Sequence, residues 1–215
     1  MNHFCFFLFL CFLVWISVSC SERKPSADGA VEKQHLIEAF EAGWGIRNTR
    51  TDSVRYQLAS LPGNDPYQLY CRAWKKAKEK QLSSALKTAD SLVMGFPKFE
   101  KGIFLRANLR LENKDTSGSI SDFERCLRKN PGFFEARMNR GSLYFQKNMV
   151  DLAYQDFREA SRLKPGDANV GRNLGNAFLV LGKPDSACFH WSNSAMLGDT
   201  VSENLLQQYC SKKSK

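Results

Sequence analysis

The sequence predicts an all-α fold, an α-solenoid of antiparallel helical hairpins that ends in a C-terminal capping helix. The first observation behind this prediction is that Pro97, Pro131 and Pro165 are spaced 34 residues apart. The second is that each proline closes a segment with the same order of small and aromatic residues. A period of this length is typical of a repeated helical hairpin, which buries its apolar face only when neighbouring hairpins stack on it.

The repeat is clearest in the unit that begins at Phe134. Small residues occupy its positions 8, 20 and 27, aromatic residues its positions 11 and 24, and proline its position 32: Gly141, Ala153, Ala160, Tyr144, Phe157 and Pro165. The next unit keeps the order with Gly175, Phe178, Ala187 and Trp191. Toward the N-terminus the signal weakens, because Arg110 replaces the aromatic residue at position 11 and the first unit depends on Ala85 and Pro97.

The spacing has a steric cause. Positions 8 and 20 are small so that helix A of a hairpin lies close to its own helix B, at an axial distance of about 8–10 Å. Proline lacks an N–H, so position 32 fits the turn before the next helix or the first turn of that helix. The pattern resembles the tetratricopeptide repeat (TPR), which implies a TPR-like superhelix of four units over 66–199: 66–99, 100–133, 134–167 and 168–199.

Two flanking segments also have helical spacing. Residues 31–65 are expected to form a divergent N-terminal helical hairpin, with helices over Val31–Trp44 and Asp52–Leu61 and with Asp52 or Ser53 as the second helix's cap. Residues 200–215 are expected to form the capping helix and a basic tail, because apolar residues recur at helical spacing before the lysines at the end.

The first nineteen residues are expected to be a signal peptide. Phe4 to Ser19 are sixteen residues without a charge, fewer than the about 20 that a membrane-spanning helix needs. Ser17 to Ser19 precede Cys20, and this segment resembles the lipobox of bacterial lipoproteins, in the looser form of Bacteroidota. The resemblance implies that Cys20 is lipidated and becomes the first mature residue. Ordinary signal-peptidase cleavage and an uncleaved anchor are the alternatives.

The leader determines the expected location. Residues 20–30 are polar and contain Pro25 and Gly29, so they are predicted to be a flexible tether behind the lipid. The protein is expected to be exported and lipid-anchored in a bacterial cell envelope, at the outer membrane, where it faces the periplasm or the surface. The formal charge of +9 lies outside the leader and favours anionic partners or an anionic membrane surface.

Export also permits disulfides. Cys126 occupies the small position 27, so it is most simply a buried packing residue. Cys188 and Cys210 lie on the last hairpin and the capping helix, where they can be neighbours, but their spacing does not decide whether they pair. The sequence contains no CxxC motif, which argues against a zinc knuckle or a redox centre.

No catalytic or cofactor motif is recognisable. The three histidines, His3, His35 and His190, do not form a zinc-binding pair, and His190 is interpreted as a partly packed helix residue. The basic cluster around Trp74 is interpreted as a solvated helix face, because an exported protein rarely meets nucleic acid. We therefore expect a non-enzymatic protein with no cofactor, no metal, no nucleic-acid partner and no small-molecule substrate.

The TPR resemblance implies a partner-binding groove on the A helices. In that family positions 2, 5, 9 and 12 line the concave face, which here selects Tyr67, Tyr70, Trp74, Phe104, Asn108, Leu111, Met138, Ser142, Phe145, Arg172, Asn176 and Leu179. Aromatic and apolar side chains dominate its N-terminal half, as expected for a site that binds a protein or peptide. Alternatively, the N-terminal hairpin or the tether covers this half, and Trp74 and Phe104 are interior residues.

Arginine recurs at position 7 as Arg72, Arg106 and Arg140. Either the stems cover apolar neighbours while the guanidinium groups reach water or a carboxylate, or the three form a row that binds an anion. The TPR carboxylate clamp is not predicted, because Phe104 and Asn169 stand where its lysines would be. The expected function is a protein–protein interaction scaffold, and the alternative is binding of an anionic glycan or peptidoglycan.

Overall fold

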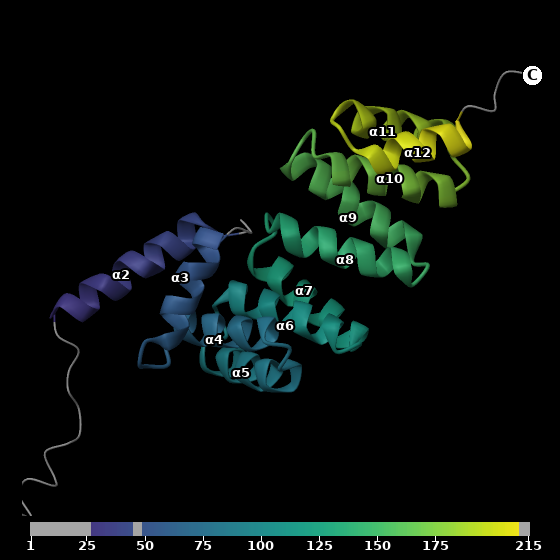
Figure 1. Ribbon diagram of the computed structural model, residues 1–215. Coiled ribbons are helices and arrows are strands. Elements are labelled where there is room, and N and C mark those ends of the chain that lie inside the picture. Colours follow the sequence, from purple (N-terminus) through teal and green to yellow (C-terminus); the bar gives the residue numbers. More distant parts are fainter. Residues whose placement is uncertain (1–26, 45–48, 211–215) are drawn as a thin grey trace, which may run out of the picture. The chain divides into compact units, whose positions relative to one another are not determined.

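The computed structural model describes residues 27–44 and 49–210, and every regular element within these ranges is an α-helix. The chain divides into two compact units, the first ending at Leu58 and the second beginning at Ala59. The predicted all-α solenoid is confirmed by the second unit, in which consecutive helices pack on one another (Figure 1). The leader, Cys20 and the tail 211–215 lie outside the described residues.

The N-terminal unit contains α2 (Ala27–Ala42) and most of α3 (Thr49–Ser60). The predicted tether 20–30 is wrong at its end, because α2 already includes residues 27–30; a single glycine inside a helical segment is tolerated. Likewise α3 begins one turn before Asp52, which lies in its first turn and accepts a hydrogen bond from Arg55 Nη1 at 3.0 Å.

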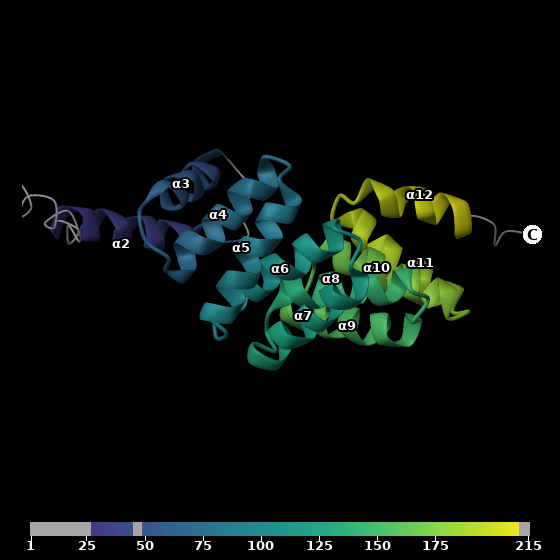
Figure 2. The same ribbon diagram turned by 90° about the horizontal axis from the view of Figure 1, so that it is seen from below.

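The C-terminal unit consists of four A–B hairpins and a final helix. The hairpins are α4 (Pro66–Lys78) with α5 (Leu82–Gly95), α6 (Glu100–Glu112) with α7 (Thr116–Lys129), α8 (Phe134–Gln146) with α9 (Val150–Leu163), and α10 (Ala168–Val180) with α11 (Pro184–Met196). Helix α12 (Thr200–Tyr209) packs on α11 (Figure 2). The A helices α4 and α6 contact each other, as do α8 and α10, so the A helices form one face of the stack.

The turns between these helices follow from the sequence. Asp65, Asp115, Asp167 and Asp199 each begin a helix by accepting backbone N–H groups of its first turn. The three repeat prolines lie in the turns before α6, α8 and α10. Each A–B turn has one residue with a positive φ of 60–70° at position 15: Lys80, Lys114, Asn148 and Gly182. The four hairpins therefore share one turn geometry.

The small residues at position 8 lie directly beneath the aromatic residues at position 24. A Cβ atom added to Gly141 would lie 2.8 Å from Phe157 Cε1, and one added to Gly175 would lie 2.4 Å from Trp191 Nε1. Phe157 is 1% exposed and Trp191 is 0% exposed. The ring of helix B thus packs on the backbone of helix A, which explains why glycine stands at this position in both units.

Two buried aspartates hold helix A to helix B. Asp122 accepts hydrogen bonds from Arg106 Nε and Nη2 at 2.8 and 2.6 Å and from Arg110 Nη1 at 2.9 Å. One unit later, Asp156 accepts from Arg140 Nε and Nη2 at 2.8 and 2.7 Å. Both aspartates are 2% exposed. Such bidentate pairs are the stronger kind of ion pair, and they fix the angle between the two helices of each hairpin.

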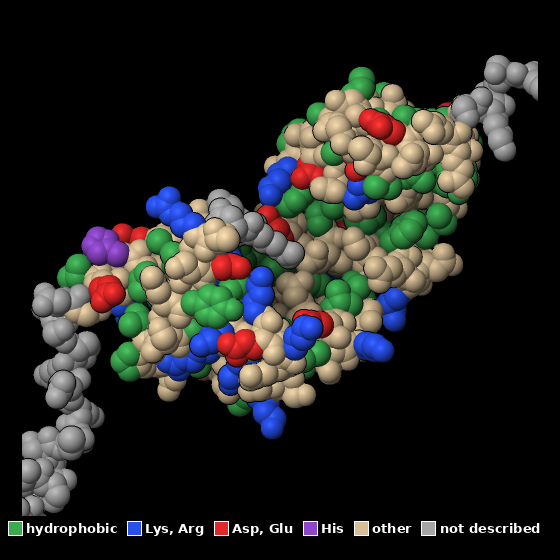
Figure 3. All heavy atoms as spheres, in the orientation of Figure 1, with side chains coloured by type: hydrophobic (Ala, Val, Ile, Leu, Met, Phe, Trp, Pro, Cys, Tyr) green, Lys and Arg blue, Asp and Glu red, His purple; other side chains and the backbone are tan. Residues whose placement is uncertain are grey.

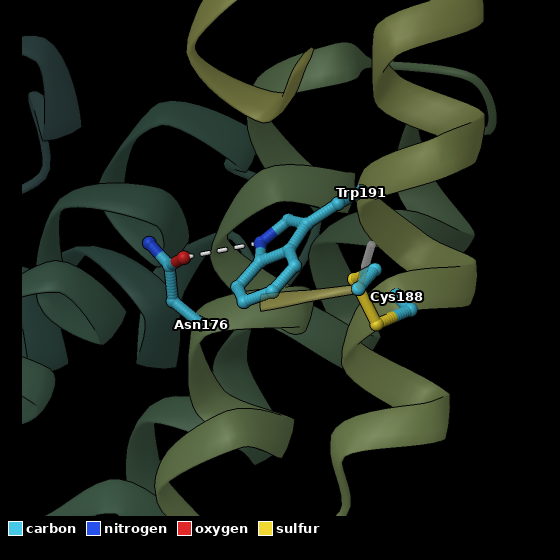
Figure 4. The surroundings of a disulfide bond; sticks show 4 residues. Asn176, Cys188 and Trp191 are labelled. Carbon is cyan, nitrogen blue, oxygen red and sulfur yellow. Dashed lines mark hydrogen bonds between the residues drawn. A yellow bond between two sulfur atoms is a disulfide. The ribbon is translucent and has the colours of Figure 1, made fainter. Parts of the chain in front are cut away.

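The last hairpin is joined to the capping helix by a disulfide between Cys188 and Cys210, whose Cα atoms are 5.9 Å apart (Figure 4). The sequence had left this pairing open. The ring of Tyr209 lies 5.7 Å from that of Trp191. Cys126 is fully buried as expected, and burial raises the pKa of its thiol to about 12. Within the described ranges, none of the helices combines the length and the apolar composition of a membrane span.

Candidate functional site

A cavity of about 180 Å³ opens on the A-helix face between α8 and α10. It is lined by Ser142, Phe145 and Gln146 of α8, Phe157 of α9, and Asn173 and Asn176 of α10. Three of these residues, Ser142, Phe145 and Asn176, belong to the groove that the sequence analysis expected. The structure therefore brings predicted residues from two successive units to one site.

The lining is polar but uncharged. It offers the carboxamides of Gln146, Asn173 and Asn176, the hydroxyl of Ser142, and the rings of Phe145 and Phe157. Carboxamides and hydroxyls both donate and accept hydrogen bonds, and the rings supply apolar contact. The six residues include no acid, base or thiol, so the cavity is suited to recognition rather than to acid–base or nucleophilic chemistry.

Two of the polar groups are held in place by the fold. The Asn176 Oδ1 atom accepts a hydrogen bond from Trp191 Nε1 at 3.1 Å, as Figure 4 shows. The Ser142 hydroxyl donates to the backbone oxygen of Met138 one turn earlier, at 2.9 Å. Met138 itself packs against the buried cluster around Phe157. These side chains are therefore positioned before any partner binds.

The N-terminal part of the predicted groove is more closely packed than expected. Tyr70 is only 6% exposed, so its assignment to the groove surface is wrong. The rings of Tyr67 and Tyr70 lie edge-on to Phe99, at 5.2 and 6.4 Å. Phe99 immediately precedes α6, so both tyrosine rings pack at the start of the next unit. Sequence position alone could not show this contact.

Trp74 and Phe104 are half-buried. The Lys78 ammonium lies 5.4 Å from the centre of the Trp74 ring. Phe104 lies against Phe123 and Phe133, with ring centres 5.7 and 4.9 Å apart. Phe104 thus contributes to packing between its own unit and the next, which is closer to the interior interpretation than to an open groove.

The remaining groove candidates are also half-buried. Asn108 donates to the Phe104 backbone oxygen and accepts from Asn139 Nδ2 at 3.0 Å, which links α6 to α8.

Arg172 forms an ion pair with Asp199 and donates to Asn169. Its guanidinium group therefore secures the start of α12 instead of facing a ligand. Leu111 and Leu179, the last two groove candidates, are half-buried as well.

The arginines at position 7 have partners inside the chain. Arg106 and Arg140 bind the buried aspartates described above, and Arg106 Nη1 also donates to Asp90 at 3.1 Å. Arg72 donates to the backbone oxygens of Ala59 and Leu61 and to Asn64 Oδ1, at 3.2, 2.7 and 2.9 Å. Arg106 and Arg140 thus have the carboxylate partners of the first interpretation, whereas the partners of Arg72 are backbone and carboxamide oxygens, which neither interpretation included.

Three cavity residues were missed by the sequence analysis. Asn173 and Gln146 are at positions 6 and 13, outside the four groove positions that the TPR resemblance implies, and Phe157 was assigned to packing alone. The signal that could have found the first two is their polarity beside Phe145 and Asn176 on helix A. A helix face is wider than four fixed positions, since residues three and four apart lie side by side.

Elsewhere in the described chain, basic side chains lie on the surface (Figure 3) and His190 is packed against a ring. On the face shown in Figure 3, Lys and Arg side chains gather over α4–α7 and are sparse over α10–α12. The ring of His190 is stacked on that of Phe178 with centres 5.2 Å apart, and burial lowers the pKa of its imidazole. In the described part of the chain, no group of His, Cys, Asp or Glu side chains is arranged to hold a metal ion.

Stacked hairpins, position-8 glycines beneath aromatic rings and a cavity on the A-helix face define a TPR-like α-solenoid. The chain is similar in fold to the crystal structure of MamA, with a TM-score of 0.60 and 14% identity, over 82% of this chain and 96% of that one. It is likewise similar to MamA 41-end from Desulfovibrio magneticus RS-1, with a TM-score of 0.59 and 15% identity, over 77% of this chain and 94% of that one.

A sequence relative is the DnaJ protein P58IPK homolog of Arabidopsis thaliana, which is 28% identical over 111 residues. The match covers 51% of this chain and 23% of that protein, so the chain spans less than a quarter of its length. No family model matches the sequence. The structural similarities are at low identity and show the fold alone.

Proposed function

We propose that this protein is a protein–protein interaction scaffold that binds a peptide segment of its partner on the A-helix face. The observation that carries the proposal is the cavity between α8 and α10, where hydrogen-bonding and apolar groups from two units converge. The TPR-like fold supports it, because stacked repeats create extended surfaces for partners. The absence of acids, bases and thiols from the lining favours binding over catalysis.

A peptide is a suitable occupant for physical reasons. Its backbone and side chains present alternating donors and acceptors, which match the carboxamides and hydroxyl of the lining. The cavity is smaller than the about 300–1,000 Å³ of typical small-molecule pockets, so it fits one side chain of a longer ligand. The rest of the ligand would extend along the A helices, toward Asn108 and Asn139.

Anionic glycan binding is the less favoured function. It relied on a row of arginines at position 7, and Arg72, Arg106 and Arg140 all have hydrogen-bond partners within the chain. A ligand anion would have to displace Asp122 and Asp156, which are almost fully buried. No other observation favours a glycan.

Filling the cavity is expected to weaken peptide binding strongly. Peptides selected from a random displayed library on the full-length wild type should bind the Ser142→Phe variant at least about tenfold more weakly, because the phenyl ring occupies the cavity and removes the hydroxyl. The matched control is Ser121→Phe, at an exposed position of α7, which should bind normally. Affinities are measured by titration calorimetry. Peptides that bind Ser142→Phe as tightly as wild type would place the interaction elsewhere.

The proposal also includes lipid anchorage of the scaffold in a bacterial envelope through Cys20. The signal-peptide pattern supports it, and so does the disulfide between Cys188 and Cys210, because disulfides persist in oxidising, exported environments. Cells of a bacterial host fed a radiolabelled fatty acid should label the wild type and not the Cys20→Ala variant. The control Cys11→Ala, which changes a cysteine inside the leader, should remain labelled. An unlabelled wild type would contradict this part of the proposal.

A further inference from the structure

The orientation of the Asn176 carboxamide is determined by its neighbour. An indole N–H can only donate, so the atom that faces Trp191 Nε1 at 3.1 Å must be the carboxamide oxygen (Figure 4). Because that oxygen is engaged, the group that Asn176 has left for a ligand is its amino group. This amino group has no hydrogen-bond partner among the residues that the structure describes, so it is available as a donor.

Whereas Asn176 offers a donor, the hydroxyl of Ser142 offers an acceptor. Its hydrogen is given to the Met138 backbone oxygen at 2.9 Å, so the lone pairs of Oγ are what it can offer to a ligand. The cavity therefore contains one fixed donor on α10 and one fixed acceptor on α8. Gln146 and Asn173 have no such hydrogen bond within the described chain, and their carboxamides can adapt.

The residue that fixes the donor is itself rigid. Trp191 is 0% exposed. Its ring lies so close to the Gly175 backbone that a Cβ there would be 2.4 Å from Nε1. The ring of Tyr209 packs on the indole, with ring centres 5.7 Å apart. The indole N–H also donates to the Arg172 backbone oxygen, at an Nε1–O distance of 3.3 Å. An indole held on these sides cannot rotate away from Asn176 without unpacking the last hairpin.

We propose that the cavity recognises an uncharged carboxamide side chain, glutamine or asparagine, of the bound peptide, and that Trp191 is the positioning residue for this selectivity. A carboxamide oxygen accepts from Asn176 Nδ2 while its amino group donates to Ser142 Oγ. Its short apolar stem lies against Phe145, which is half-buried. The inference depends on the proposed peptide-binding function and adds the chemical identity of the side chain bound.

Other side chains fit this arrangement less well. A carboxylate has no hydrogen to give to Ser142, and none of the six lining residues is a cation that could offset its loss of water. An aliphatic side chain leaves both the donor and the acceptor without partners when water is displaced. A lysine ammonium can only donate, so it would leave the Asn176 amino group without an acceptor.

The test uses the full-length chain and three small probes, the N-acetyl methylamides of glutamine, glutamate and norleucine. Binding is followed by NMR through the indole N–H signal of Trp191 and the side-chain amide signals of Asn173 and Asn176. The glutamine probe should shift these signals and saturate, with a dissociation constant at least about fivefold lower than that of either other probe at pH 7. Equal binding of all three, or no shift at these groups, would overturn the proposal.

Two variants test the residue roles. Asn176→Asp still accepts the Trp191 hydrogen bond but replaces the amino donor with an oxygen, so binding of the glutamine probe should fall at least about tenfold. Trp191→Phe removes the N–H that sets the orientation, and the preference for glutamine over glutamate should narrow. The control Asn204→Asp, on an exposed position of α12, should change neither the affinity for the glutamine probe nor the preference for glutamine over glutamate. Should Trp191→Phe unfold, Asn176→Asp alone decides the outcome.

Failure of this inference is distinguishable from failure of the proposed function. Library peptides that require Ser142 but carry no glutamine or asparagine at the cavity would refute the carboxamide preference and leave the scaffold function standing. Unchanged glutamine binding by Asn176→Asp would refute the role given to Asn176. If neither the probes nor any peptide depends on the cavity, both proposals fail together.

Discussion

Replacing Asp156 with asparagine is expected to destabilise the protein by about 3 kcal/mol, near the lower end of the range for breaking a buried ion pair. The Asp156 side chain is 4% exposed, and Arg140 and Arg137 approach it to 2.7 and 3.4 Å. Asparagine keeps the shape but leaves two guanidinium groups without their counter-charge. Their side chains are 19% and 15% exposed, so water can offset only part of the loss.

The measurement is urea unfolding of the full chain at pH 7, followed by circular dichroism at 222 nm. The matched control is Asp151→Asn, which changes an exposed carboxylate in the first turn of the same helix and should cost less than about 0.5 kcal/mol. A loss below about 1 kcal/mol for Asp156→Asn would mean that the arginines find equivalent partners in water. The same substitution at Asp122 should also destabilise the protein, but by less, because Arg106 keeps its hydrogen bond to Asp90.

Loss of the Cys188–Cys210 disulfide should cost about 3 kcal/mol, because the bond closes a loop whose ends are 22 residues apart and restricts the unfolded chain. The expected local effect is faster amide hydrogen exchange across α12. Without the bond, this helix is held by Tyr209 on Trp191 and by Asp199, which caps it and binds Arg172.

The experiment compares oxidised and reduced wild type with the double variant Cys188→Ser/Cys210→Ser. The reduced wild type and the double variant should unfold at the same urea concentration, and a reductant should have no further effect on the variant. The buried residues Cys71 and Cys126 serve as the internal check, since neither of them belongs to a disulfide in the structure. Equal stability of the oxidised and reduced wild type would show that packing alone secures α12.

The fold was predictable because its signal is steric and local. A glycine that must lie beneath a ring recurs with that ring, as Gly141 with Phe157 and Gly175 with Trp191. The buried ion pairs were also within reach of the sequence, because Asp122 and Asp156 are themselves 34 residues apart and follow their arginines by 16. Their identical spacing distinguishes them from the carboxylates of a solvated helix face.

The candidate site was predictable only in part. The helix-A positions placed Ser142, Phe145 and Asn176 on one face, and in the structure all three line the same cavity. They could not show that Phe99 would cover Tyr70, because that contact depends on how a loop residue turns. The selectivity inferred for the cavity depends on a hydrogen bond from Trp191, a residue of helix B whose role in the fold gave no hint of it.

The disulfide also bears on how the length of such a chain can change. Both cysteines lie in the terminal module formed by α11 and α12. A whole unit could therefore be duplicated or deleted upstream, for instance between Pro131 and Pro165, without separating the two sulfur atoms. The number of repeats can thus vary during evolution while the disulfide still joins the last hairpin to the capping helix. In an engineered array, the segment from Ala168 onward would serve as a transferable end piece.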